Sequence, residues 1–346
     1  MSFLDDLKAA ASKFGSQVDT VLGPLYPEIK VKLDDLTGKR YLITGSNTGV
    51  GYEAAKALAA HNAEVWLLCR TKEKAEEAAT QIIKDTSNSR VYVEIVDVSS
   101  FASVRAFVDK WSTKSTEERK IDALVNNAGA STNTKKTTAD GLEFTYETNF
   151  AGHFLLTLLL LKQGYFAPSA RIVNVTSVAM YDSGKIEPAM TNSEDVLGPF
   201  QDGQAIPWDA HLKLYQRAKA SQVVFTKELQ DILSSSKNYN DMTVSVCHPG
   251  IVKTTMWKRE DGTGGYEKES AAMEKMTNLM GMTPADGAKT MVFLAASPKA
   301  ANKEIRGEYW DRCKPRWTPA WMNDKETRAS LWAKWEADTG VDIAQL

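Results

Sequence analysis

Short apolar runs alternate with helix-like stretches along most of this chain, and the alternation predicts an α/β fold. Runs of strand length occupy residues 41–43, 64–69, 91–96, 121–125, 171–175 and 242–247. Stretches with helical character lie between them, including 52–60, 72–83 and 212–233. Strands this uniformly apolar are typical of a parallel sheet that helices cover on both faces.

The first strand runs into a glycine-rich turn that predicts a diphosphate site. The turn reads Thr44-Gly45-Ser46-Asn47-Thr48-Gly49-Val50-Gly51, and an alanine-rich helix and a second strand follow it. Gly45 permits a tight turn, Gly49 lets the backbone approach a phosphate, and Gly51 lets the helix pack closely on the strand. The free N–H groups of the first helical turn then face the ligand. The residues predicted to contact a dinucleotide here are Gly45, Ser46, Asn47, Gly49, Val50 and Gly51.

Residues 1–36 are predicted to form an amphipathic helical extension that precedes a domain spanning 37–346. Apolar residues recur there every three or four positions, at Leu4, Leu7, Ala11, Phe14, Val18, Val21 and Leu25. We expect this helix first to pack on the protein's own surface and second to form a homodimer contact. Membrane association is disfavoured, because the polar face is slightly acidic and unsuited to anionic lipid.

Composition excludes several classes of function. The 346 residues are 43% apolar, which suffices for one large core, and 42 basic residues against 44 acidic ones leave no footprint for nucleic acid. Cys69 and Cys247 are expected to be small buried thiols in a reducing compartment, and the four histidines lack metal-ligand spacing. No apolar stretch reaches the ~18 residues of a membrane span, so a cytoplasmic protein is expected.

Two motifs together resemble the short-chain dehydrogenase/reductase family. They are the Gly-x-x-x-Gly-x-Gly spacing of 45–51 and Asn126-Asn127-Ala128-Gly129 after the fourth strand. The run from Thr138 through Asn149 resembles the retinol dehydrogenase-like branch, although that branch commonly has histidine where Phe150 stands. The resemblance implies a single doubly wound Rossmann-type domain of about seven parallel strands, the last near 307–310, with the ligand at their carboxyl ends.

The family's catalytic motif, Tyr-x-x-x-Lys, occurs at Tyr26/Lys30, Tyr52/Lys56, Tyr181/Lys185 and Tyr215/Lys219. Only the last pair lies in a long helical stretch between the fifth and sixth strands, where the spacing places both side chains on one face. The resemblance implies that Tyr215 is the general acid/base. The ammonium of Lys219, together with oxidised nicotinamide, favours the phenolate and is expected to lower the Tyr215 pKa. The resemblance further implies that Ser177 donates a hydrogen bond to the substrate and that Asn149 anchors a water near the lysine.

The end of the second strand carries Cys69-Arg70 rather than the acid that binds the adenosine ribose of NAD. Because a guanidinium can pair with a 2′-phosphate, Arg70 favours NADP(H). Asp97 is assigned to the adenine by resemblance, and it could equally cap the next helix. The other cofactor contacts implied by resemblance are Val98, Asn126, Ala128, Gly129, Lys219, Tyr215, Pro249, Gly250, Val252 and Thr254.

Two segments are expected to border a substrate. Residues 181–212 form an insertion between the catalytic serine and tyrosine, and residues 255–283 form either an apolar lid or a helix pair with core methionines. We therefore predict an NADP(H)-dependent oxidoreductase that interconverts a carbonyl and an alcohol on a mainly apolar small molecule. The alternative is a dinucleotide-binding regulatory or scaffold protein with little catalysis, for which residues 1–30 would be the partner surface.

Overall fold

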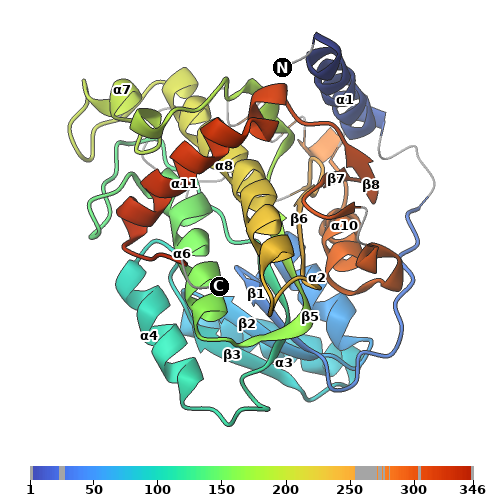
Figure 1. Cartoon of the computed structure of the whole chain (residues 1–346). Helices are drawn as coiled ribbons and strands as arrows, with labels where there is room; N and C mark the ends of the chain where they lie inside the picture. The colour runs from blue at the N-terminus through green and yellow to red at the C-terminus, as the bar shows by residue number, and fades with distance from the viewer. Residues whose placement is uncertain are drawn as a thin grey trace.

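The computed structural model describes residues 3–22, 28–253, 271, 275, 277–279, 281–302 and 305–343. A central sheet with strand order β3-β2-β1-β4-β5-β6-β7-β8 organises them (Figure 1). Its strands are β1 (Arg40–Thr44), β2 (Glu64–Cys69), β3 (Val91–Ile95), β4 (Ile121–Asn126), β5 (Phe166–Val175), β6 (Thr243–His248), β7 (Tyr309–Asp311) and β8 (Lys314–Arg316). β1 to β7 run parallel, as the sequence predicts.

The eighth strand is a difference from the expected seven. β8 pairs antiparallel with β7, and the two join through Arg312 and Cys313, which have φ of 51° and 57°. A two-residue hairpin loop of this kind normally carries glycine or asparagine. Because neither residue is present here, the turn leaves no signal in the sequence.

Helices cover both faces of the sheet. One face carries α2 (Gly49–Ala59), α3 (Lys72–Thr86) and α10 (Pro284–Ala296), and the other carries α4 (Phe101–Ser112), α6 (Gly152–Lys162) and α8 (Trp208–Ser235). Side chains of β1 alternate between the two cores, with Leu42 in one and Tyr41 and Ile43 in the other. This buried, doubly covered sheet explains why its strands read as continuous apolar runs.

The C-terminal helix α11 (Lys325–Thr339) adds an aromatic layer over α6 and α8. Trp335 lies 4.5 Å from Phe150 between ring centroids, and Trp332 lies 5.1 Å from Phe154. Phe150, which stands where the retinol dehydrogenase-like branch commonly has histidine, is therefore a core residue. Trp317, in the same tail, is instead 56% exposed.

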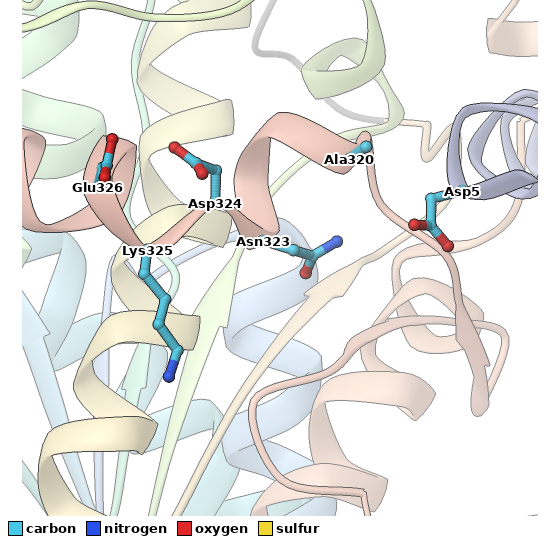
Figure 2. Close-up of a pocket in the computed structure, with 6 residues that line it drawn as sticks. All are labelled: Asp5, Ala320, Asn323, Asp324, Lys325 and Glu326. Carbon is cyan, nitrogen blue, oxygen red and sulfur yellow. The ribbon is translucent and has the colours of Figure 1, made fainter. Parts of the chain in front are cut away.

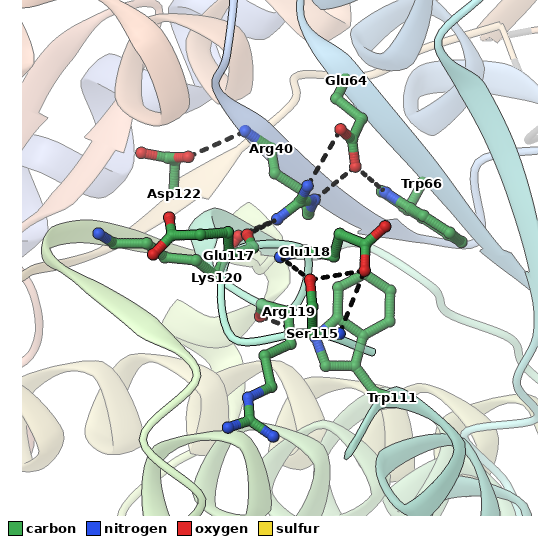
Figure 3. A network of polar contacts seen from close by, with 10 residues as sticks. All are labelled: Arg40, Glu64, Trp66, Trp111, Ser115, Glu117, Glu118, Arg119, Lys120 and Asp122. Carbon is green, nitrogen blue, oxygen red and sulfur yellow. Dashed lines mark hydrogen bonds and ion pairs between the residues drawn. The ribbon is translucent and has the colours of Figure 1, made fainter. Parts of the chain in front are cut away.

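A polar network closes the amino end of the sheet (Figure 3). Arg40, at the start of β1, forms an ion pair with Glu64 and donates to the carbonyls of Glu117 and Lys120 at 2.9 and 2.8 Å. Trp66 Nε1 donates to the same Glu64 carboxylate at 2.7 Å. Burial raises the Glu64 pKa, but the hydrogen bonds from Arg40 and Trp66 outweigh it and hold that pKa below its usual value.

Helix α1 (Phe3–Leu22) lies on the outside of the molecule, near β8 (Figure 1). Its own residues Ala9, Ser12 and Ser16 are buried, on the side of the helix that faces the protein. The expected contact with the protein's own surface therefore exists, although the small and polar face makes it rather than the apolar stripe. None of the described helices is long and apolar enough to cross a membrane.

Candidate active site

The glycine-rich turn leaves the first turn of α2 open. Thr48 caps α2 with an extended backbone, and its side chain makes no capping hydrogen bond. Gly49 has φ of 59°, and no atom of the described residues lies within 4 Å of the place where its Cβ would be. The N–H groups that begin a helix need an acceptor, which an anion can provide. This turn therefore fits the diphosphate of a dinucleotide.

The other two glycines of the turn are required by close packing. A Cβ on Gly45 would lie 2.8 Å from Ala128 Cα, and one on Gly51 would lie 2.6 Å from the Gly45 carbonyl oxygen. Ser46 is fully buried, and its hydroxyl donates to the Ile43 carbonyl at 2.8 Å. The Ser46 hydroxyl therefore serves the fold of the turn. Val50 is also buried, within the apolar cluster of α2 and α10.

Thr44 joins the glycine turn to the Asn-Asn-Ala-Gly motif, a role that the sequence did not reveal. Its hydroxyl accepts the N–H groups of Asn127 and Ala128, both at 2.9 Å, and lies 2.9 Å from His153 Nε2. With both lone pairs engaged, the hydroxyl has its own proton to give, and His153 Nε2 and the Val125 carbonyl, at 3.4 Å, are the acceptors in reach. Burial lowers the His153 pKa to about 3, so the ring is neutral, in keeping with the structural role expected of the histidines. Asn127 Nδ2 also donates to the Thr44 carbonyl at 2.9 Å.

The carboxyl ends of β2 and β3 present the residues predicted to hold adenosine. Arg70 is exposed and makes no ion pair or hydrogen bond with any other described residue. Asp97 accepts from the Ser99 amide at 2.9 Å and from its hydroxyl at 2.7 Å, so it shapes the turn before α4, and Ser100 is the cap of that helix. The Val98 carbonyl lies 1.9 Å from where a Cβ on Gly152 would be, which explains the glycine there.

A π-helical turn at Glu147–Ala151 places Asn149 beside the open surface of Gly129. Asn149 Nδ2 donates to the carbonyls of Ala130 and Thr145, at 2.6 and 2.8 Å. The backbone carbonyl of Asn149 accepts from Gln222 Nε2 at 2.7 Å. Its Oδ1 is buried without a partner among the described residues. Wide turns of this kind are common at functional sites, because they redirect side chains within a helix.

Lys219 approaches the same spot from α8. A Cβ added to Gly129 would lie 2.7 Å from Asn149 Oδ1 and 3.5 Å from Lys219 Nζ. Nζ donates to the Val175 carbonyl at 3.0 Å. Burial lowers the Lys219 pKa to about 8, which leaves the amine close to titration at neutral pH.

Tyr215 lies one helical turn before Lys219, with the lysine Nζ 5.6 Å from the centre of its ring. The side chain of Ser177, two residues after β5, lies near the Tyr215 hydroxyl and favours the phenolate. Burial raises the Tyr215 pKa to about 12, and the effect of Ser177 offsets burial only in part. In the chain alone, desolvation of this buried phenol outweighs what its neighbours provide, and the fall in pKa expected with oxidised nicotinamide stays a prediction.

Side chains of the other Tyr-x-x-x-Lys pairs make different contacts where the structure describes them. Tyr181 donates to the Trp317 carbonyl at 2.6 Å, and its partner Lys185 is exposed beyond a glycine with φ of 68°. Lys56 pairs with Asp85 at 2.6 Å. Tyr26 lies outside the described residues.

Several predicted cofactor residues have side chains that serve the fold. Asn126 Nδ2 donates to Thr157 Oγ1 and Asn174 Oδ1, at 2.9 and 2.8 Å, within the core. Val252 is buried, and a Cβ on Gly287 would lie 2.6 Å from its Cγ2. A cofactor contact by either residue would have to use its backbone. Gly250 has φ of 87° and Pro249 is half-buried beside it, whereas Thr254 and most of the expected lid 255–283 lie outside the described residues.

The insertion between Ser177 and Tyr215 packs against the segment that follows the Asn-Asn-Ala-Gly motif. The Ile206 amide donates to the Asn133 carbonyl at 2.9 Å, and the Lys135 amide donates to Gln204 at 2.8 Å. Arg217 of α8 holds Asp195, in the short helix α7 (Glu194–Leu197), through two hydrogen bonds of 2.7 Å. Leu197, Ile206, Ala210 and Leu214 form a small apolar cluster at the start of α8.

A shallow surface hollow of about 480 Å³ lies elsewhere, and none of the predicted site residues lines it (Figure 2). Its walls are polar side chains from α1 and from the start of α11, among them Asp5, Asn323 and Asp324. The candidate site is therefore located by the convergence of Asn149, Lys219 and Gly129, and not by this hollow.

Comparisons with known proteins identify the family of this chain. Residues 39–189 match the family model described as short chain dehydrogenase. The chain is 33% identical to human retinol dehydrogenase 12 over 86% of this chain and 85% of that protein. It is 32% identical to human retinol dehydrogenase 13 over 86% of this chain and 84% of the relative.

Solved structures share the fold at lower identity. An uncharacterised protein from Mycobacterium paratuberculosis superposes with a TM-score of 0.66 at 24% identity, over 90% of this chain and 97% of that one. A short chain dehydrogenase from Shigella flexneri, solved in complex with NADP, superposes with a TM-score of 0.56 at 19% identity, over 82% of this chain and all of that one. The solved structures show the shared fold. The family model and the sequence relatives show that the chain belongs to the short-chain dehydrogenase/reductase family, in its retinol dehydrogenase-like branch.

Proposed function

We propose that this protein is an NADP(H)-dependent oxidoreductase that interconverts an aldehyde or ketone and the corresponding alcohol on a mainly apolar substrate. The observation that carries the proposal is the convergence of Ser177, Tyr215, Lys219 and Asn149 at the carboxyl ends of the strands, beside the open α2 N-terminus. Membership of an oxidoreductase family supports the reaction class.

The chain's own groups suit proton transfer to a carbonyl oxygen. The cofactor supplies or accepts a hydride at the substrate carbon, and negative charge grows on oxygen during reduction. Ser177 donates a hydrogen bond to that oxygen, and Tyr215 donates the proton. A phenol with a pKa of about 12 is protonated at neutral pH and is therefore in the form needed for donation.

Lys219 and Asn149 support the tyrosine. When Tyr215 gives up its proton, a charged Lys219 nearby stabilises the phenolate. Asn149 Oδ1 faces the same space as Lys219 Nζ and can accept a hydrogen bond from a water held between them. Such a water provides a path by which a proton returns to the site.

Arg70 supports the preference for NADP(H). Its guanidinium is exposed directly after β2, and the Gly45 amide ties the glycine turn to Leu68 of that strand at 2.8 Å. A cationic group beside the cradle, with no acid in its place, favours a 2′-phosphate.

The apolar substrate class is supported by two observations. The insertion next to Tyr215 places an apolar cluster, including Ile206 and Leu214, at the start of α8. The curated relatives are named for retinol, an apolar alcohol.

A binding and turnover experiment tests the proposal. We would titrate the purified protein with NADPH and with NADH by fluorescence, and then follow cofactor absorbance with a panel of apolar aldehydes and ketones that includes retinal. We expect preferential NADPH binding with turnover, and Arg70→Ala should weaken NADPH binding by about tenfold or more while sparing NADH. Lys84→Ala, which removes an exposed charge near the far end of α3, is the control.

Each unfavourable outcome has a defined meaning. Binding without turnover of any carbonyl would support the regulatory alternative. A preference for NADH in the wild-type protein would contradict the role assigned to Arg70.

A further inference from the structure

Helix α1 carries an uncharged apolar stripe that points away from the protein. Leu4 and Leu7 are each 55% exposed, Phe14 is 68% exposed and Leu22 is 38% exposed. These four residues, the outer stripe, follow one another at helical spacing along a single face. An amphipathic helix on a globular protein normally turns such a face toward the core, so the orientation of α1 is inverted.

Polar contacts from the opposite side of α1 fix this orientation. Asp19 forms an ion pair with Arg316, and Lys13 forms one with Asp182. The Trp317 amide donates to Ser12 Oγ at 3.0 Å. The outer stripe is therefore directed outward by specific contacts on the inner face.

An exposed aromatic residue lies beside the helix. Trp317 is 56% exposed, and Lys8 Nζ lies 4.4 Å from the centre of its ring. Tryptophan is favoured where an apolar layer meets water, because its ring is apolar and its N–H is polar. Figure 1 shows α1 at the edge of the molecule, near β8.

The size of the outer stripe argues against a second copy of this chain as its cover. A helix of 20 residues is about 30 Å long, so a stripe about 10 Å wide offers roughly 300 Å² per copy. Two such stripes would bury roughly 600 Å², well below the ~1,200 Å² at which stable interfaces begin. A lipid surface has no such threshold, because partitioning increases with each apolar side chain buried.

We propose that α1 docks the protein onto an electrically neutral lipid surface, with the outer stripe and Trp317 inserted among the lipids. The stripe contains no basic residue, Lys13 is paired with Asp182, and Lys8, beside Trp317, lies 4.0 Å from the Asp5 carboxylate, so attraction to anionic headgroups does not contribute. This agrees with the acidic polar face, which disfavours anionic lipid but not neutral lipid. The helix lies in the plane of the lipid surface and does not cross it.

The docking surface is connected to the candidate active site. The short helix η3 (Val178–Asp182) follows Ser177 directly, and its Asp182 pairs with Lys13 of α1. Tyr181 of η3 donates to the Trp317 carbonyl at 2.6 Å. An apolar substrate dissolved in the lipid would therefore be delivered close to the site, a consequence that rests on the proposed function, whereas the docking itself does not.

Cosedimentation with vesicles of phosphatidylcholine tests the proposal. We expect the wild-type protein to bind these vesicles, with little dependence on salt. Phe14→Asp should weaken partitioning by about tenfold or more, because a charge replaces the most exposed apolar side chain of the stripe. Gln17→Asp is the matched control, because Gln17 is an exposed residue of the same helix outside the stripe, and binding should be unchanged.

A second variant excludes loss of the helix as the cause. Phe14→Ala removes the ring without adding charge and favours the helix, so circular dichroism should be unchanged while vesicle binding falls by about threefold or more. Activity of both Phe14 variants toward a water-soluble carbonyl should equal that of the wild type. This readout separates failure of docking from failure of the proposed function.

Three results would overturn the proposal. The first is equal vesicle binding by the wild type and Phe14→Asp. The second is binding only to vesicles that contain phosphatidylserine, abolished by salt. The third is a dimer in sedimentation velocity that Phe14→Asp dissociates, without any vesicle binding, which would identify a second copy as the partner.

Discussion

At the amino end of the sheet, Arg40 and Glu64 satisfy each other, whereas at the carboxyl end a buried side-chain oxygen of Asn149, beside Lys219, has no partner in the part of the chain that the structure describes. The two regions also shift the pKa values of their acids in opposite directions. Arg40 and Trp66 hold the pKa of Glu64 below its usual value despite burial. Burial raises the pKa of Glu147, at the π-helical turn, to about 8. One end therefore uses its polar groups for stability, and the other keeps them available at a cost in stability.

The largest effect that would sharpen this comparison is expected from Tyr215→Phe. Loss of the phenolic proton should lower kcat by a factor of about 10² to 10⁴, because proton transfer to the substrate oxygen loses its donor. The melting temperature and NADPH binding should change little. Tyr181→Phe is a matched control, since it removes the hydroxyl of another Tyr-x-x-x-Lys pair, and this hydroxyl donates to the Trp317 carbonyl. Comparable losses in the two variants would contradict the assignment.

A large effect on stability is expected at the other end of the sheet. Arg40→Ala removes the ion pair and two hydrogen bonds to carbonyls, and leaves the mostly buried Glu64 carboxylate with Trp66 alone. The free energy of unfolding in urea should fall by about 2–4 kcal/mol, while kcat per folded molecule stays constant.

A double-mutant cycle checks the physical reason. Adding Glu64→Gln to Arg40→Ala removes the unpaired charge, so part of the lost stability should return. Strictly additive losses would show that Arg40 acts mainly through the Glu117 and Lys120 carbonyls. A fall in kcat would show that the two ends are coupled, contrary to the comparison.

The sequence predicts the sheet well, because burial on both faces leaves each strand as an apolar run. It also predicts that Tyr215 and Lys219 lie together on one long helix after the fifth strand, and α8 contains both residues. The roles of the candidate catalytic residues stay predictions. The contacts made by Thr44, His153 and Gln222 could not be predicted, because their partners lie far away in sequence.

Two further features depend on tertiary structure. The periodicity of α1 identifies its apolar stripe but not the face that docks, because Asp182 and Arg316, which decide it, come from distant segments. The Tyr215 pKa could not be predicted from the nearby lysine, because its direction is set by the depth of burial. In both cases the spacing in the sequence identifies the residues. Contacts with distant segments then determine which face of α1 docks and in which direction the Tyr215 pKa shifts.

The smallest effect concerns the pH dependence of stability, where the two ends should differ in sign. Glu147 is fully buried, and Asp140 and Asp97 add to the effect of burial on its pKa of about 8. The folded chain therefore keeps a proton that the unfolded chain releases, so this stability is present below pH ~4.5 and is lost as the pH rises toward about 8. Glu147→Gln, which can keep the hydrogen bond to Thr138, should reduce the loss between pH 5 and 8 by about 1–3 kcal/mol in urea titrations. Glu118→Gln, at the amino end, should leave that slope unchanged, because its pKa already lies below this range; parallel curves for all three proteins would show that Glu147 is ionised in the folded state.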